Sequence, residues 1–580
     1  MRRLCHAAYA SWMAAQVELH GQYSAERVVA FDAYGSYATR WRLCALLIVS
    51  PLPCLMFVIV YDWFPLRPPS EGLEASRNFW IRTLLGTLVL SYSIVLQFRH
   101  NIRGLPLTHW HVIMISVVSS VGLCAILIGI ASRLGFPLPF MVILGATPWS
   151  LLASATGYVF LRTHLQNDPE LVNSVRRYSA VFYAQTFLTV AYPAYTYVFQ
   201  RLESQSQAAF ACFLPILKLA SKNLFSYASR HIEDLKPELV VFNVEVFSAL
   251  YVSSCLQKTT SIYSTIVIMS ADAIHAWLSI KDVHDLLNDP KLVLARRTTG
   301  DMPLLPLTMH LIQSDPMIRQ HPSIQLESCM APTATTAVVA RATQQHDNLL
   351  HHHRPLGGPR LHQVMPLPLE SSKFLFVAPA NSPAIFLPHQ SRNPQAVTNN
   401  QRRLALATTT KLKRAFWRPS GQVATTELHA CCQQLTSDEK LFIVQHTLRV
   451  LHASEFIGLV EYVEVVVPFV YSLFALLTFH FPNRAFYSMY NGMDSHKLHN
   501  TLWNLVIYGF LELLSLIILD AVLRRQLRIS AFTQTAFVLE TQWPMVQSKL
   551  ALWVTVALQY AIVHYGADFS FRFEWLQQPQ

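Results

Sequence analysis

FIGLVEYVEVVVPFVYSLFALLTFH, residues 456–480, decides the fold, because it is long and apolar enough to cross a bilayer as one helix. A helix rises about 1.5 Å per residue, so about twenty apolar residues cover the roughly 30 Å hydrocarbon core. Glu461, Glu464 and Pro468 lie inside this apolar run. The stretch therefore predicts a transmembrane helix that carries ionisable groups.

Ten further windows share this length and apolar character. The chain has 580 residues, of which 52% are hydrophobic and only 14% are charged, against about 25% charged in ordinary soluble proteins. We predict an all-α, polytopic transmembrane helical bundle of about eleven spans, eight plus three. The predicted spans are 43–61, 79–98, 111–131, 136–161, 180–199, 208–226, 239–256, 261–280, 456–480, 501–523 and 549–566.

A long polar segment separates the two membrane domains, residues 43–284 and 456–566. Residues 285–435 are rich in Pro, His, Gln, Thr and Ser, which predicts a disordered cytosolic linker. A basic cluster near its end suits an anionic lipid leaflet, and a solvated linker with an ordinary basic bias is the alternative. The cluster comprises Arg402, Arg403, Lys411, Lys413, Arg414 and Arg418.

Residues 436–455 follow the linker and show helical spacing of apolar residues. Thr436 and Glu439 form a possible capping box at the start of this segment. The pattern predicts an amphipathic helix on the inner membrane surface that turns into the next span at about Phe456.

The distribution of Lys and Arg among the short loops predicts the orientation. With a cytosolic N-terminal segment, residues 1–42, basic residues favour the cytosolic loops by roughly two to one. The C-terminal tail, residues 567–580, then lies outside or in a lumen. The chain is predicted to reside in the plasma membrane or an endomembrane.

Ionisable residues inside the spans are the strongest pointers to function, because each is costly in hydrocarbon. Lys218 is the one well-embedded cation, so we expect some carboxylates to be protonated, hydrated or bound to a cation. Pro468 is predicted to break its helix and to free the carbonyl of Glu464. The candidate ion or proton path comprises Glu245, Asp272, His275, Glu461, Glu464 and Glu512.

These residues favour a secondary transporter or ion-permeation protein that acts on a small cation or proton. The alternative is a membrane scaffold or sensor whose linker binds protein partners, with purely structural carboxylates that hydrogen-bond between helices. The chain has no nucleophile elbow, phosphate-binding glycine loop or zinc-protease motif, so no enzyme activity and no cofactor is predicted. No metal site is predicted either, because the membrane histidines lack matching partners. The basic residues follow membrane topology, which excludes nucleic acid as a predicted partner.

Several stretches resemble a family of uncharacterised multi-pass membrane proteins from oomycetes. They are SPLPCLMFVIVYDWFPLRPP at 50–69, GFPLPF at 135–140, HIEDLKPELVVFNVEVFSALYVSSCLQ at 231–257, LVEYVEVVVPFVYS at 459–472 and HYGADFSFRFEWL at 564–576. The resemblance covers both membrane domains and omits the linker. It implies an integral membrane protein and no particular activity or binding residue.

Overall fold

The computed structural model describes residues 16–102, 104–202, 206, 210, 213–258, 262–297, 304–319, 321, 324, 425–559 and 561–566. These residues are mainly helical and form no strand; one isolated antiparallel bridge joins Tyr487 and Ile562. The predicted all-α fold is therefore confirmed. The helices are η1 (Val17–Leu19), α2 (Ala25–Tyr37), α3 (Arg40–Val49), α4 (Leu52–Asp62), α5 (Gly72–Ala75), α6 (Arg77–Asn101), α7 (His109–Leu134), α8 (Met141–Asn167), α9 (Pro169–Arg201), α11 (Phe213–Ala228), α12 (Lys236–Val240), α13 (Val246–Lys258), α14 (Ile262–Arg297), α15 (Leu304–Ser314), α16 (Pro316–Arg319), α19 (Thr425–Gln434), α20 (Ser437–Thr478), α21 (Ser495–Gln526), α22 (Ala531–Thr541) and α23 (Trp543–Val554), with short 3₁₀ and π turns between some of them.

All eleven predicted windows overlap helices, but fewer of those helices are long and apolar enough to cross a membrane. Six segments meet both conditions among the described residues: Arg40–Asp62, α6, α7, α8, α20 and α21. The window 208–226 corresponds to α11, which has 16 residues and carries two lysines. The window 239–256 is divided by a π turn. Crossing by the five remaining windows stays a prediction.

Large apolar side chains on the outside of the bundle agree with a membrane setting. A soluble monomer rarely exposes so many of them along one helix, whereas a lipid-facing helix does so as a rule. On α21 the exposed apolar residues are Trp503, Ile507, Phe510, Leu511, Leu514, Ile517 and Ile518. The fold is thus that of a helical membrane protein.

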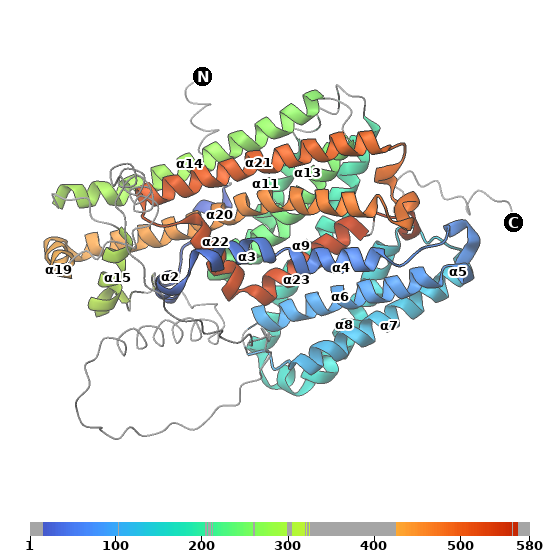
Figure 1. The fold of residues 1–580 in the computed structure, drawn as a ribbon. Helices are drawn as coiled ribbons and strands as arrows, with labels where there is room; N and C mark the ends of the chain where they lie inside the picture. The colour runs from blue at the N-terminus through green and yellow to red at the C-terminus, as the bar shows by residue number, and fades with distance from the viewer. Residues whose placement is uncertain are drawn as a thin grey trace, which may run out of the picture. The chain divides into compact units, whose positions relative to one another are not determined.

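Helix α20 is the centre of the packing. Its 42 residues extend about 63 Å, twice the thickness of the hydrocarbon core. It packs against α21 and α14, which run beside it in Figure 1, and against α13, α22 and α15. The carboxylates on its middle turns consequently face other helices rather than lipid.

Residues 436–455 are predicted to form a helix that turns into the next span at about Phe456; the helix is present as the first half of α20, but the turn is absent. The predicted capping box of Thr436 and Glu439 is confirmed. Val444, Leu448 and neighbouring apolar residues are fully buried. They pack against η1, α15 and α22, which provide the apolar contacts that we had expected from lipid.

The predicted helix break at Pro468 is also wrong, since α20 continues to Thr478 without interruption. A proline removes one backbone hydrogen bond, and a helix that is supported by its neighbours on both sides of the proline tolerates that loss. Pro468 is itself buried in these contacts.

The predicted linker, 285–435, is too long at both ends. Helix α14 continues to Arg297, and α15 buries an apolar face that includes Leu307 and Leu311 against α20. Helix α19 begins at Thr425. The apolar residues of α15 recur at helical spacing, so they form one face that packs against a neighbouring helix.

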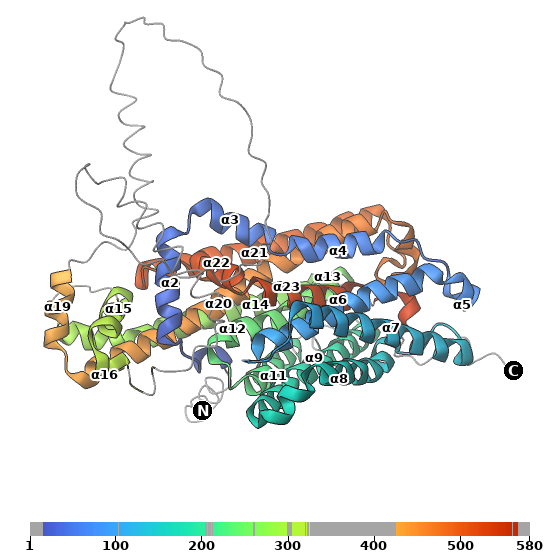
Figure 2. The same ribbon diagram turned by 90° about the horizontal axis from the view of Figure 1, so that it is seen from below.

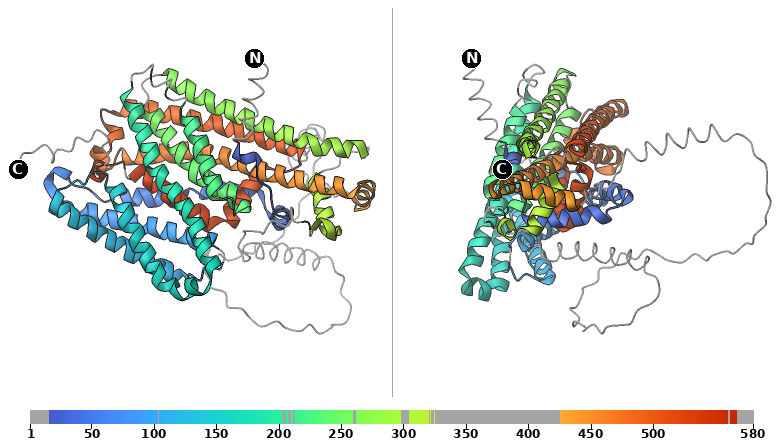
Figure 3. Two further views of the ribbon diagram at one scale, coloured as in Figure 1. Left: turned by 180° about the vertical axis from the view of Figure 1, so that it is seen from behind. Right: turned by 90° about the vertical axis from the view of Figure 1, so that its left-hand side faces the viewer.

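A second group of helices packs beside the first. Helices α6, α7 and α8 form an up-and-down set whose core includes Val95, Val112 and Leu161. Helix α23 packs against α6 and α4 and so joins this group to the helices around α20, as the view in Figure 2 shows. Helix α9 contacts α8, α6, α11 and α13 and crosses α20 obliquely in Figure 3.

Candidate functional site

Two lysines of α11 form the positive part of a buried charge cluster. Lys218 and Lys222 are one helical turn apart and so lie on one face of the helix. Lys218 Nζ lies 2.8 Å from Glu245 Oε2 and 2.6 Å from Glu464 Oε1. Lys222 Nζ lies 2.8 Å from Glu245 Oε1 and 3.6 Å from Glu18 Oε1. Glu245 is therefore held between both ammonium groups.

Glu245 is the last residue of a π turn, Val241–Glu245, between α12 and α13. A π turn places an extra residue in a helix and rotates the following side chains relative to an ideal helix; such turns are frequent at functional sites. Glu245 is 1% exposed. The Asn243 amide supports this turn by donating to the carbonyl of Leu239 at 2.6 Å.

Three carboxylates from two helices form the negative part of the cluster. Glu461 and Glu464 are three residues apart on α20 and share a face, and Glu512 approaches from α21. One oxygen of each lies within 4.8 Å of the others, and all three residues are buried. That spacing and the all-oxygen ligand set suit one hard cation.

Among the described residues of this cluster, carboxylates outnumber ammonium groups. Five carboxylates, including that of Glu18, surround the ammonium groups of Lys218 and Lys222. Like charges in a low-dielectric interior raise the free energy of the fully ionised state. A proton or a cation bound among these carboxylates would lower that free energy.

Most of the predicted path residues meet at this cluster. Glu245, Glu461, Glu464 and Glu512 are brought together as described. The His275 ring, on α14, is close enough to Lys222, Lys218 and Glu245 to interact with them electrostatically. Asp272 is also on α14, but its side chain lies outside the described part of the structure, as does the basic cluster at 402–418.

The sequence did not indicate that Lys222 and Glu18 belong to the cluster. Lys222 lies near the end of the predicted span 208–226, and its spacing of four from Lys218 is a signal that both share a face. Glu18 lies before the first apolar window and carries no such signal. Lys222 contributes the second cation that the sequence seemed to lack.

Three further ion pairs are buried in the described structure, and the sequence did not predict them. Their side chains are fully enclosed, and their distances are 2.6 Å for Arg27 to Glu455, 2.8 Å for Arg82 to Asp62 and 2.7 Å for Lys549 to Glu238. The first pair anchors α2 to α20, with Tyr23 also donating to Glu455. Burial and the Glu455 carboxylate raise the pKa of Tyr23, so this phenol stays protonated.

Buried amides connect the π turn to a neighbouring set of helices. Asn243 Oδ1 accepts hydrogen bonds from Gln185 Nε2 at 2.6 Å and from Trp553 Nε1 at 3.1 Å. Gln185 also donates to Gln97 Oε1 at 2.9 Å. Because these residues come from α6, α9 and α23, the network positions the turn that ends at Glu245.

Comparison with family models, curated proteins and solved structures finds no match for this chain. The resemblance to the oomycete membrane family stays a prediction.

Proposed function

We propose that this protein is a membrane transporter or ion-permeation protein that binds a proton or a small hard cation at Glu461, Glu464 and Glu512. One observation carries the proposal: three carboxylates from α20 and α21 converge within 4.8 Å inside the bundle, next to a lysine on a third helix. Ionisable residues within membrane helices are costly, and where they occur they commonly mark ion and proton paths.

Lys218 gives the site a way to respond to occupancy. Its ammonium is shared between Glu464 in the carboxylate triad and Glu245 at the end of the π turn. A proton or cation that neutralises the triad weakens the attraction between Lys218 and Glu464, because the two positive charges compete for the same oxygen. Lys218 then favours Glu245, and binding is coupled to the position of α11 relative to α20.

The scaffold or sensor function remains the alternative, in which these ion pairs only hold the helices together. It predicts that neutralising one carboxylate alters stability without altering any flux. The two functions therefore separate in a flux measurement on reconstituted protein.

The test is proton and cation flux in liposomes that contain the purified full-length chain. Glu464→Gln removes the charge that Lys218 and the triad share, and we expect flux to fall at least about tenfold. Glu540→Gln is the matched control, since Glu540 forms an ion pair with Arg42 and takes no part in the cluster. Flux should persist in this control.

Two results contradict the proposal. One is wild-type protein that carries no proton or cation across a broad ion panel. The other is an equal flux in Glu464→Gln, Glu512→Gln and wild type at matched reconstitution. Either result would favour the scaffold function and direct attention to the segment 325–424.

A further inference from the structure

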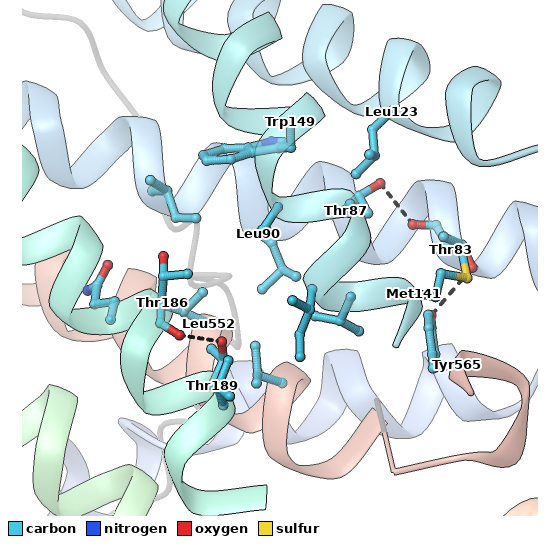
Figure 4. Close-up of a pocket in the computed structure, with 18 of the residues that line it drawn as sticks. Thr83, Thr87, Leu90, Leu123, Met141, Trp149, Thr186, Thr189, Leu552 and Tyr565 are labelled. Atoms are coloured by element: carbon cyan, nitrogen blue, oxygen red, sulfur yellow. Dashed lines mark hydrogen bonds between the residues drawn. The ribbon is translucent and has the colours of Figure 1, made fainter. Parts of the chain in front are cut away.

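A cavity of about 150 Å³ lies among α6, α7, α8, α9 and α23, apart from the charge cluster. Figure 4 shows Leu90, Leu123 and Leu552 around it, with Trp149 at one side. Aliphatic and aromatic side chains make up most of the lining, and several threonines complete it. The hydrogen bonds that the polar groups of this lining make within the protein indicate which kind of molecule the cavity can hold.

The threonine hydroxyls are used within their own helices. Thr87 donates to the carbonyl of Thr83 at 2.8 Å, Thr186 to that of Phe182 at 3.0 Å, and Thr189 to that of Thr186 at 2.7 Å. A hydroxyl that bonds back to its helix leaves the methyl group as the more available surface. These threonines therefore add apolar rather than polar surface to the cavity.

The larger polar side chains in the lining also have partners. Trp149 Nε1 donates to Ser91 Oγ at 2.6 Å, and Trp553 Nε1 and Gln185 Nε2 donate to Asn243 Oδ1. A cavity whose polar groups are satisfied offers water too few hydrogen bonds, and a cavity of this size with an apolar lining takes up an apolar guest such as benzene. The expected ligand is a hydrocarbon.

The cavity lies on a lipid-facing side of the bundle. Ile143 of the lining is 41% exposed, and only 6% of the apolar window of α8 is buried within the protein. In a bilayer that exposed surface is covered by lipid chains. A chain can therefore enter from the side, without passing through water.

We propose that this cavity binds the end of one hydrocarbon chain of a bilayer lipid. Its volume fits a chain segment and excludes a whole lipid, so the headgroup stays outside in the bilayer. The Thr83 hydroxyl and the Tyr565 phenol lie 3.4 Å apart at one end of the lining, and they bond each other rather than the guest. The site is separate from the proposed ion site and does not rest on it.

The test is photolabelling of the full-length protein in nanodiscs made with a phosphatidylcholine that carries a diazirine near the end of one acyl chain. Adducts in the wild type should concentrate on the residues of α6, α7, α8 and α9 that line the cavity. Ala146→Phe fills the cavity from α8, and labelling of these peptides should fall at least about fivefold. Ala155→Phe places the same side chain at an exposed position of α8 and should leave labelling unchanged.

A second variant separates a hydrocarbon site from a polar one. Thr186→Val keeps the shape and removes the hydroxyl, so labelling should persist, whereas a site that recognises a polar group would lose it. The melting temperature of each variant confirms folding. Labelling that spreads evenly over the exposed faces of α7, α8 and α21, or that is equal in Ala146→Phe and wild type, overturns the proposal.

Discussion

The ammonium nitrogen of Lys218 lies 2.6 Å from Oε1 of Glu464, although the two residues are 246 positions apart in the chain. This ion pair joins α11, which precedes the long polar segment, to α20, which follows it. The ion pair thus links the two predicted membrane domains, which lie on either side of the polar segment in the chain, within one helical bundle.

Removing either partner of this pair should destabilise the protein, and removing both should cost less than the sum. Lys218→Met leaves the carboxylates of Glu464 and Glu245 with one ammonium group fewer, while Glu464→Gln relieves part of that excess. We expect a coupling energy of roughly 1–3 kcal/mol in equilibrium unfolding in detergent micelles. Strictly additive effects of the two substitutions would show that the contact contributes nothing.

The pair of Lys549 and Glu238 should be the more sensitive to single substitutions, because both side chains are fully buried 2.7 Å apart. Lys549→Met leaves a buried carboxylate without its cation and should cost about 3–5 kcal/mol. The double variant Lys549→Met with Glu238→Met replaces both charges by apolar groups of similar length and should recover most of that loss. Denaturant unfolding of the four proteins checks this, and a double variant less stable than either single one would contradict it.

Asp282 gives the stability a dependence on pH. Burial, with Asp285 and Glu18 nearby, raises the pKa of Asp282 to about 6, and this residue follows the predicted span 261–280. A raised pKa in the folded state means that the contribution to stability is complete below the unfolded pKa of about 3.9 and is lost as pH rises through about 6.

Asp282→Asn should therefore stabilise the protein by about 1–2 kcal/mol at pH 7 and have little effect at pH 4. Unfolding curves of both proteins between pH 4 and 8 measure the difference. A difference that stays constant across this range would exclude the titration of Asp282 as its cause.

Pro468→Ala should leave both the fold and the flux intact, because α20 is continuous through this residue. Alanine restores one backbone donor, so stability should stay equal or rise by up to about 1 kcal/mol. Circular dichroism with thermal unfolding tests whether the fold and its stability are kept, and the liposome assay tests whether the flux is kept. A large loss of flux at unchanged stability would show that Pro468 acts on the ion site after all.

The class of fold was predictable, because a bilayer imposes a local rule on the sequence. About twenty apolar residues in succession must form a helix, since every backbone group has to be satisfied within its own segment. Windows such as 456–480 and 501–523 could thus be recognised one at a time. The capping box of Thr436 and Glu439 was predictable for the same reason, as its hydrogen bonds span three residues.

The predicted turn at Phe456 and the predicted break at Pro468 were wrong because both depend on what surrounds the segment. An amphipathic helix buries its apolar face equally well against lipid or against other helices, and the pattern is the same in either case. Here η1, α15 and α22 cover the first half of α20. A proline likewise bends or breaks a helix only as far as the neighbouring helices allow.

By itself, the sequence determined that the chain forms apolar helices with carboxylates inside them, because hydrophobicity and helical spacing are local properties. Only the tertiary structure decided that Lys218 bridges Glu245 and Glu464, that Glu512 joins the two glutamates of α20, and that Lys222 belongs with them. The physical reason is that the free energy of a buried charge depends on groups within a few ångströms, and those groups come from helices far apart in the chain.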